Sequence, residues 1–146
     1  MAPEDQKTRI GRVLEEAFNK GNVNVFDEVM ASDIVYHIPP RPDVKGLAAY
    51  KQYMADLRKA LSGFQFTIHE LIVDGDIDAG RWTIRGTHTG QLPGTPVPPT
   101  GKQVTMTGLY MSRTVNDRVV EQWNYTDLVG LMQQLGVAPQ TGKAGG

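Results

Sequence analysis

Histidine is the side chain best suited to carry protons near neutral pH, and this sequence contains three. His88 lies at the end of a long run of alternating residues, two positions before Gly90. A neutral imidazole there can act as a general base, because its ordinary pKa of about 6.5 lets it exchange protons around neutrality. It can equally be a structural histidine that bonds to a loop carbonyl. Trp82 has the same strand parity and is expected to line the same wall.

A second candidate proton carrier, His37, stands beside Tyr36 and just before Pro39-Pro40. Successive residues of a strand point to opposite faces, so one of these two side chains is expected to face the inside of the fold. We therefore take His37 as a candidate catalytic residue and Tyr36 as a candidate ligand contact. The third histidine, His69, is expected to be exposed.

Amide side chains alternate with aromatic ones near the C-terminus. Gln122 and Asn124 share one face of a predicted strand, so they either contact a ligand or satisfy buried backbone groups. Asp127 follows and is a possible base. However, it directly precedes a predicted helix, where aspartate is a good N-cap, and a capped carboxylate is a weak base. The sequence therefore favours the cap.

Several other chemistries are not supported. The chain has no cysteine, which excludes disulfides, thiolate metal ligands and thiol nucleophiles. The histidines lack the close spacing of a metal site, and no Gly-x-Ser-x-Gly nucleophile motif is present. We expect neither a metal nor another cofactor.

Hydrophobic periodicity indicates the elements that must position these residues. Apolar residues recur at helical spacing around residues 10–20, 25–30 and 47–61, with Gly21 and Gly63 as helix ends. Residues 33–38 are rich in β-formers. Strict alternation then predicts strands over residues 64–68, 77–89, 103–115 and 118–126, and a short helix over 128–135.

These elements predict one α+β domain over residues 1–139, followed by a tail at 140–146. We expect a curved antiparallel sheet of four to six strands, with about three N-terminal helices packed on its concave face around a cone-shaped cavity. Gly80, Gly86 and Gly108 allow the long strands to bend. The proline-rich segment 90–101 is expected to be an ordered loop and is a candidate lid. The uncovered sheet face predicts a homodimer.

Composition and charge argue against several classes of binding partner. The 146-residue chain has a formal net charge of −1 with scattered basic residues, so nucleic-acid binding is not expected. No apolar run is long enough to span a membrane. The acidic N-terminus lacks an apolar signal region, which predicts a cytoplasmic protein.

Several strings, in their order and spacing, resemble one known family. They are Arg81-Trp82-Thr83, Arg85-Gly86-Thr87-His88-Thr89-Gly90, Pro99-Thr100-Gly101-Lys102, Val119-Val120-Glu121-Gln122-Trp123-Asn124-Tyr125-Thr126-Asp127 and Leu131-Met132-Gln133-Gln134-Leu135-Gly136. Together they are similar to the SnoaL-like polyketide cyclase family, which has the nuclear-transport-factor-two-like fold. The resemblance covers residues from Ile10 to about Pro139.

The resemblance implies a cofactor-free enzyme that closes a ring by intramolecular aldol condensation of an enolisable ester. In that family an aspartate on the last strand is the general acid/base, and its position corresponds to Asn124. An amide cannot take a proton near neutral pH, although it can hold an enolate oxygen. Tyr110 stands where some cyclases place a histidine. Its phenol either donates to a substrate carbonyl or packs in the core.

We therefore expect a cofactor-independent acid/base enzyme that cyclises or isomerises a small apolar carbonyl compound. His88 or His37 would carry the proton, and Asn124, Tyr110 and Gln122 would orient the polar end of the substrate. One alternative is epoxide-hydrolase-like addition of water. That chemistry needs an Asp-Arg-Asp group. The chain has Arg81, Arg85 and Asp127, but their positions along the predicted strands do not point them toward one site. The other alternative is a non-catalytic small-molecule binding protein, which the loss of the family aspartate favours.

Overall fold

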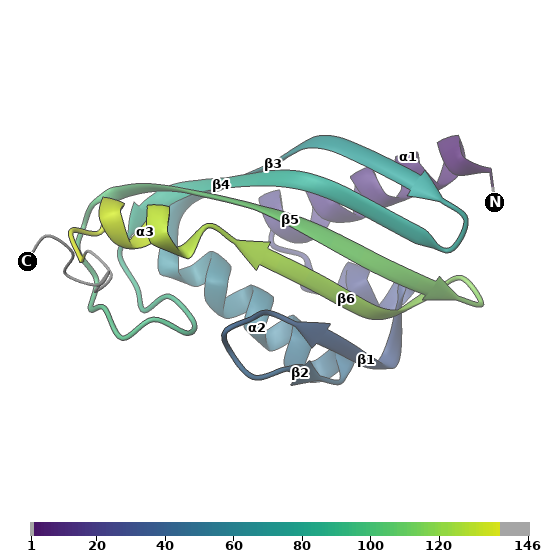
Figure 1. Cartoon of the computed structure of the whole chain (residues 1–146), viewed down its shortest axis with the longest axis horizontal. Helices are drawn as coiled ribbons and strands as arrows, with labels where there is room; N and C mark the ends of the chain where they lie inside the picture. Colours follow the sequence, from purple (N-terminus) through teal and green to yellow (C-terminus); the bar gives the residue numbers. More distant parts are fainter. Residues whose placement is uncertain (1, 138–146) are drawn as a thin grey trace, which may run out of the picture.

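A six-stranded sheet forms one wall of the molecule in a computed structural model that describes residues 2–137 (Figure 1). The strand order is β2-β1-β6-β5-β4-β3. The strands are β1 (Met30–His37), β2 (Val44–Lys45), β3 (Leu61–Asp74), β4 (Ile77–His88), β5 (Gln103–Val115) and β6 (Arg118–Thr126). The predicted tail at 140–146 lies outside the described residues.

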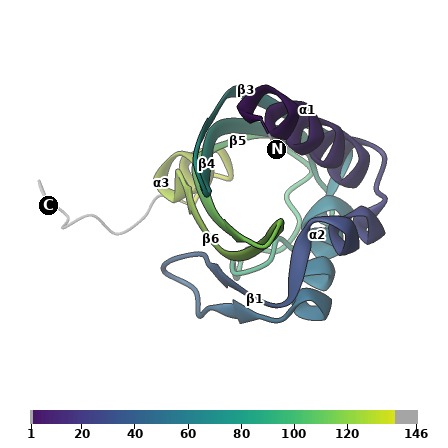
Figure 2. The same cartoon turned by 90° about the vertical axis from the view of Figure 1, so that its right-hand side faces the viewer.

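Helices close the concave side of this curved sheet (Figure 2). They are α1 (Pro3–Leu14), which continues into the π-helical turn η1 (Glu15–Asn19), the 3-10 helix η2 (Val23–Glu28) and α2 (Leu47–Ala60). A last helix, α3 (Leu128–Gln134), follows β6, and the Asp127 carboxylate accepts a hydrogen bond from the Gly130 N–H at 2.9 Å. The α+β fold and the N-cap role of Asp127 are therefore confirmed.

Two features of the sheet differ from the sequence prediction. First, β3 begins at Leu61, directly after α2, so Gly63 lies inside a strand and does not end the helix. The pairing of β3 with β4 extends from Leu61↔His88 to Asp74↔Ile77, and this ladder fixes the longer strand. Second, β1 pairs with β6 in parallel, whereas the other neighbouring strands are antiparallel.

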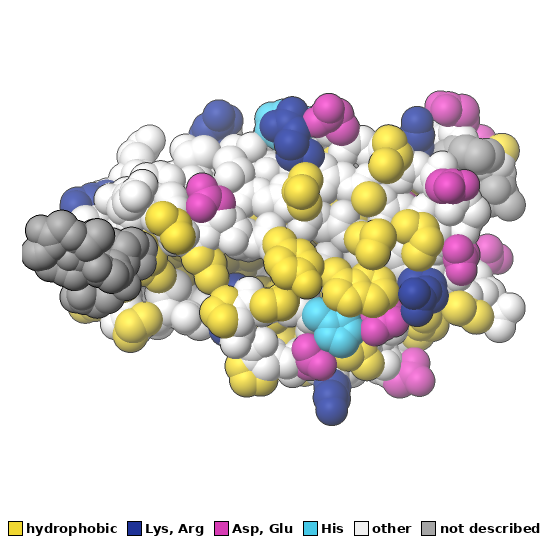
Figure 3. Space-filling model, in the orientation of Figure 1, with side chains coloured by type: hydrophobic (Ala, Val, Ile, Leu, Met, Phe, Trp, Pro, Cys, Tyr) yellow, Lys and Arg dark blue, Asp and Glu magenta, His cyan; other side chains and the backbone are white. Residues whose placement is uncertain are grey.

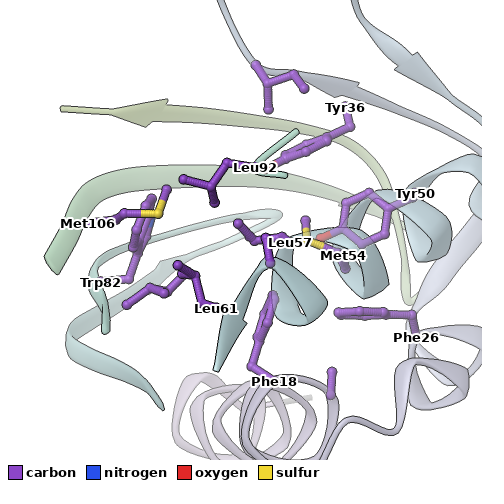
Figure 4. Close-up of a cluster of buried hydrophobic side chains, with 14 of the residues drawn as sticks. Phe18, Phe26, Tyr36, Tyr50, Met54, Leu57, Leu61, Trp82, Leu92 and Met106 are labelled. Carbon is purple, nitrogen blue, oxygen red and sulfur yellow. The ribbon is translucent and has the colours of Figure 1, made fainter. Parts of the chain in front are cut away.

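The apolar core lies between the helices and the concave face of the sheet. Side chains from α2, β1, β4 and β5 converge there (Figure 4). Aromatic rings from different elements contact edge-to-face, as Phe26 and Tyr50 do with ring centroids 5.1 Å apart. Among residues 2–137, no helix is long and apolar enough to cross a membrane.

Candidate active site

A cavity of about 140 Å³ lies inside the cone, between the helices and the sheet. Apolar side chains supply most of its wall, among them Val13, Phe18, Phe26, Met54, Leu57, Ile84 and Met106. Polar side chains reach it at a few places only. A mostly apolar cavity with a few placed polar groups is the usual form of a small-molecule site.

The sheet register decides which polar residues face this cavity. On β4, β5 and β6 the even-numbered residues point inward. One row across the sheet contains Asp78, Ser112, Gln122 and Tyr36, and the next row contains Gly80, Tyr110 and Asn124. Four strands therefore bring side chains from distant parts of the sequence to one concave surface.

Asp78 is a buried carboxylate on this surface, and it was not among the residues predicted for the site. Its residue is 7% exposed, and the Tyr110 hydroxyl donates a hydrogen bond to its Oδ2 at 2.7 Å. Burial raises the pKa of Asp78, and the hydrogen bond from Tyr110 offsets part of that rise. The sequence did contain a signal for Asp78: it lies four residues before Trp82 on the same predicted strand, so the two side chains point to the same face.

Tyr110 keeps its proton in this environment. Burial raises its pKa, and the neighbouring Asp78 carboxylate raises it further. The phenol is therefore a fixed donor to the carboxylate. Both members of the Asp78–Tyr110 pair line the cavity.

Asn124 is held in one orientation by its neighbours. The Trp82 indole N–H, which can only donate, bonds to Asn124 Oδ1 at 2.8 Å. The amide nitrogen then faces Tyr36, whose pKa is raised by burial and lowered in part by its hydrogen bond with Asn124. The Tyr36 side chain lines the cavity, and burial keeps its hydroxyl protonated.

The amide of Gln122 is hydrogen-bonded to other side chains of the protein. The Tyr50 hydroxyl donates to Gln122 Oε1 at 2.7 Å, and Gln122 Nε2 donates to Ser112 Oγ at 2.8 Å. This buried network fixes α2 against β5 and β6. Gln122 lines the cavity, but both ends of its amide already have partners.

Two glycines make room for the aromatic members of the site. A Cβ at Gly80 would lie 2.8 Å from the Tyr110 ring, and a Cβ at Gly108 would overlap the Trp82 indole. The absence of a side chain at Gly108 lets Trp82 cross β5 and reach Asn124 on β6. The strand glycines, predicted to permit bending, thus also admit these rings.

The structure does not bring the two candidate catalytic histidines into the cavity. His37 lies on the outer face, because Tyr36 occupies the inward position of β1. There its ring stacks on Trp123, Nδ1 lies 2.9 Å from Asp43 Oδ1, and Nε2 lies 2.7 Å from Glu121 Oε2. Of the pair, Tyr36 is therefore the cavity residue.

His88 is fully buried but does not line the cavity. Its Nδ1 accepts a hydrogen bond from the Thr100 N–H at 3.2 Å, so the ring is attached to the loop 90–101. Nε2 is buried with no partner among residues 2–137. His69 is exposed, as predicted, and its Nε2 lies 2.7 Å from Thr83 Oγ1.

The residues considered for epoxide hydrolysis do not meet in the cavity either. Arg81 and Arg85 are exposed, and Arg81 pairs with Glu70 on the surface at 2.6 Å. Asp127 caps α3. Within residues 2–137, no group of three histidine, aspartate or glutamate side chains is placed to hold a metal ion.

Comparison with known proteins gives a consistent result. The model of the SnoaL-like polyketide cyclase family matches residues 8–135. IdmH from Streptomyces antibioticus, a proposed polyketide cyclase, is 32% identical, with a TM-score of 0.73 over 90% of this chain and 98% of that chain. A proposed polyketide cyclase from Acidithiobacillus ferrooxidans is 31% identical, with a TM-score of 0.73 over 91% and 95%.

AclR from Streptomyces galilaeus, a proposed hydroxylase, is 25% identical, with a TM-score of 0.79 over 98% of this chain and 92% of that chain. A further structure, from Catenulispora acidiphila, is described as having a ketosteroid isomerase-like fold. No curated protein sequence matches the chain. The family match extends from α1 to α3 and includes every strand of the cavity wall, so this chain belongs to the SnoaL-like polyketide cyclase family.

Proposed function

We propose that this protein is a cofactor-independent enzyme that moves a proton on a small, largely apolar carbonyl compound and so cyclises or isomerises it. The observation that carries the proposal is the buried Asp78 carboxyl, which faces an apolar cavity and has a raised pKa. A catalytic base works best when its pKa approaches the working pH. Asp78 takes the role that the sequence analysis gave to His88 or His37.

The reaction needs only groups of this chain. The Asp78 carboxylate removes a proton from the carbon beside the substrate carbonyl and becomes a carboxylic acid. The Tyr36 hydroxyl donates a hydrogen bond to the enolate oxygen that forms. In a cyclisation the enolate carbon then attacks a second carbonyl of the same molecule, forming a carbon–carbon bond, and Asp78 returns its proton to the new alkoxide. In an isomerisation Asp78 returns the proton to another carbon.

Asn124 and Tyr110 support this chemistry without transferring the proton. Trp82 fixes Asn124, and Asn124 lowers in part the raised pKa of Tyr36. Tyr110 holds the carboxylate and, by donating to Oδ2, limits the rise of its pKa. Asp78 and Tyr36 lie in one row of the concave face, and Tyr110 and Asn124 lie in the next.

The test is proton-for-deuteron exchange, followed by NMR in heavy water with enolisable β-keto esters and cyclic ketones. We expect exchange above the buffer rate in the wild-type protein. Asp78→Asn is nearly isosteric and keeps an acceptor for Tyr110. It should slow exchange by about 100-fold or more, as expected when a positioned general base is lost. His37→Gln, on the outer face, is the matched control and should exchange like the wild type.

Two results would overturn this assignment. If Asp78→Asn exchanges as fast as the wild type, the carboxyl is not the proton carrier. A non-catalytic binding protein is the second candidate, favoured by the amide at position 124. It would replace the enzyme proposal if compounds that shift the Trp82 indole signal undergo no exchange.

A further inference from the structure

Arg41 places a positive charge in the cavity wall that neither the proton-transfer chemistry nor the core packing uses. It lies in the turn between β1 and β2, where its backbone N–H bonds to the Ile38 carbonyl at 3.0 Å. Its side chain is half-buried and lines the cavity together with Tyr53 and Pro93. In Figure 1 this turn lies at the lower edge of the molecule, to the left of the β3–β4 and β5–β6 hairpin turns.

The partners of the Arg41 guanidinium are all neutral. Nη1 donates to the Tyr53 hydroxyl and, at 2.6 Å, to the Pro93 carbonyl, and the guanidinium lies over the Tyr53 ring, 5.3 Å from its centroid. A Cβ at Gly94 would overlap the arginine side chain, so the glycine leaves room for it. No ion pair within residues 2–137 includes Arg41, and neither Nε nor Nη2 donates to another of these residues.

Three arginines outside the cavity have counter-ions, whereas Arg58, Arg85 and Arg118 form no ion pair within residues 2–137. Arg12 pairs with Glu28, Arg81 with Glu70 and Arg113 with Glu121, all on the surface. Desolvating a charge costs free energy unless an opposite charge or several hydrogen bonds replace the lost water. Arg41 has two neutral acceptors and unused donors, and its planar fork matches a carboxylate. What sets Arg41 apart is that its unused Nε and Nη2 donors belong to a side chain of the cavity wall, where they can bind an anionic group of a ligand.

Charge on the rest of the wall gives the bound molecule a direction. Asp76 and Asp117, in the hairpin turns, and Asp78 contribute negative charge away from Arg41. The other cavity arginine, Arg9, donates to the Glu28 carbonyl at 3.0 Å. Because Asp76, Asp78 and Asp117 outnumber Arg9, an anionic group is favoured at Arg41.

We propose that the natural ligand is a small apolar carboxylic acid whose carboxylate binds Arg41. This inference rests on the proposed function, which places the reacting carbonyl end of the ligand at Asp78. The contact also joins the loop 90–101 to the ligand, because Arg41 already bonds to Pro93 in that loop. Substrates of this class carry the acid at one end and the enolisable carbonyl at the other.

The test compares benzoate with benzamide, which have nearly the same shape but differ in charge. A single ring suits a cavity of about 140 Å³, close to the volume of an engineered cavity that binds benzene. Binding is followed by protein NMR through the two indole N–H signals. Trp82 donates inside the cavity, whereas Trp123 stacks on His37 outside it and serves as the internal control.

We expect benzoate to shift the Trp82 signal and to bind about tenfold more tightly than benzamide, because a charge-assisted pair outweighs a neutral one. Arg41→Gln should reduce this ratio to about one while benzamide affinity stays unchanged, which also shows that the cavity is intact. Arg41→Lys should keep part of the preference, and Arg9→Gln should keep all of it. Salt should weaken benzoate binding to the wild type and leave benzamide binding unaffected.

Equal affinities in the wild type, a preference that survives Arg41→Gln, or a benzoate shift at Trp123 alone would each overturn the proposal. So would the absence of a saturable Trp82 shift with benzoate. These outcomes are distinct from failure of the proposed function. Binding is measured here without turnover, whereas the exchange test uses neutral ketones and esters. Exchange without carboxylate preference would reject only the anion site, and carboxylate preference without exchange would reject only the chemistry.

Discussion

Burial of the Asp78 carboxyl affects stability as well as chemistry. The folded protein favours the protonated form of this group, because burial raises its pKa above the ordinary value of 3.8. Above that ordinary value the unfolded chain loses the proton more readily than the folded one. The contribution of Asp78 to stability therefore falls as the pH rises from about 3.8 through the raised pKa.

We predict that Asp78→Asn stabilises the protein near neutral pH while it removes exchange activity. The amide carries no charge to desolvate and still accepts from Tyr110. The gain should shrink as the pH falls below the raised pKa and vanish below the ordinary one. Urea unfolding of both proteins across this range measures it. An Asp78→Asn protein that is less stable than the wild type at neutral pH would contradict the prediction.

The pKa of His37 is also raised, so its contribution to stability changes with pH in the same direction as that of Asp78, but here the cause is carboxylate partners that favour the charged form. Its hydrogen bond to Glu121 is the main cause of its raised pKa, burial opposes the rise, and Asp43 adds to it. A histidine with a raised pKa contributes stability that is complete below its ordinary value of 6.5 and is lost as the pH rises through the folded value. We predict that in His37→Gln the free energy of unfolding falls less steeply with pH between 6.5 and the raised pKa than in the wild type, as measured by urea unfolding. Asp43→Asn should reduce this slope only in part.

Sequence reasoning placed the strand side chains of the site better than its histidines. Period-2 alternation predicted that Gln122 and Asn124 share a face, and the structure places both at the cavity. It could not choose between Tyr36 and His37, because parity gives opposite faces without saying which is inside. Asp78 was missed because a carboxylate beside a turn resembles an ordinary surface residue until the register shows which way it points.

At the scale of elements, the close crossing of β5 by the Trp82 indole makes Gly108 sensitive to substitution. A Cβ there would overlap the indole and lie 2.5 Å from the Tyr125 carbonyl. We predict that Gly108→Ala destabilises the protein by about 1–3 kcal/mol, the usual cost of overpacking, and separates Trp82 from Asn124. Unfolding curves and the indole NMR signal report the two effects.

Gly11→Ala is the matched control for this prediction. A Cβ at Gly11, in α1, meets no atom within 4 Å. Alanine is the better helix former by about 0.5–1 kcal/mol, so this variant should be as stable as the wild type or more so. Equal stability of the Gly108→Ala protein and the wild type would show that β5 shifts to accept the methyl group.

The elements themselves followed from the sequence except where distant pairing decides them. Helical periodicity indicated α2, and alternation indicated β4, β5 and β6 at nearly their observed bounds. The early start of β3 depends on its ladder with β4, which adds pairs such as Ser62↔Thr87. Similarly, the parallel pairing of β1 with β6 has no local signal, since the two strands are far apart in the sequence.

At the scale of the whole molecule, the outer face of the sheet carries an apolar patch formed by Leu109, Met111, Trp123 and Tyr125 (Figure 3). The register joins them, with Leu109 opposite Tyr125 and Met111 opposite Trp123. Leu109 and Tyr125 are each 58% exposed, and α1 and α2 lie on the concave side of the sheet, away from them. Contiguous exposed apolar surface of this kind marks an interaction site.

We propose that a second copy of the chain covers this outer apolar patch. Arg113 and Glu121 border the patch with opposite charges, so a copy related by a two-fold axis can oppose unlike charges. We predict that Leu109→Asp converts a dimer to a monomer in sedimentation equilibrium. Ala49→Asp, at an exposed position of α2 on the opposite side of the molecule, should leave the dimer intact. A wild-type monomer, or a dimer that survives Leu109→Asp, would exclude this interface.

The parallel pairing of β1 with β6 also bears on the order in which the protein is made. Apart from two residue pairs with β2, the sheet partners of β1 all lie in β6, which leaves the ribosome after the other five strands. Until then a nascent chain has its main helices and most of its hairpins, but the inner wall between Tyr36 and Tyr110 is open. Native contacts between such distant segments form slowly. A chain stalled before Arg118 would therefore present its apolar interior to solvent and to chaperones.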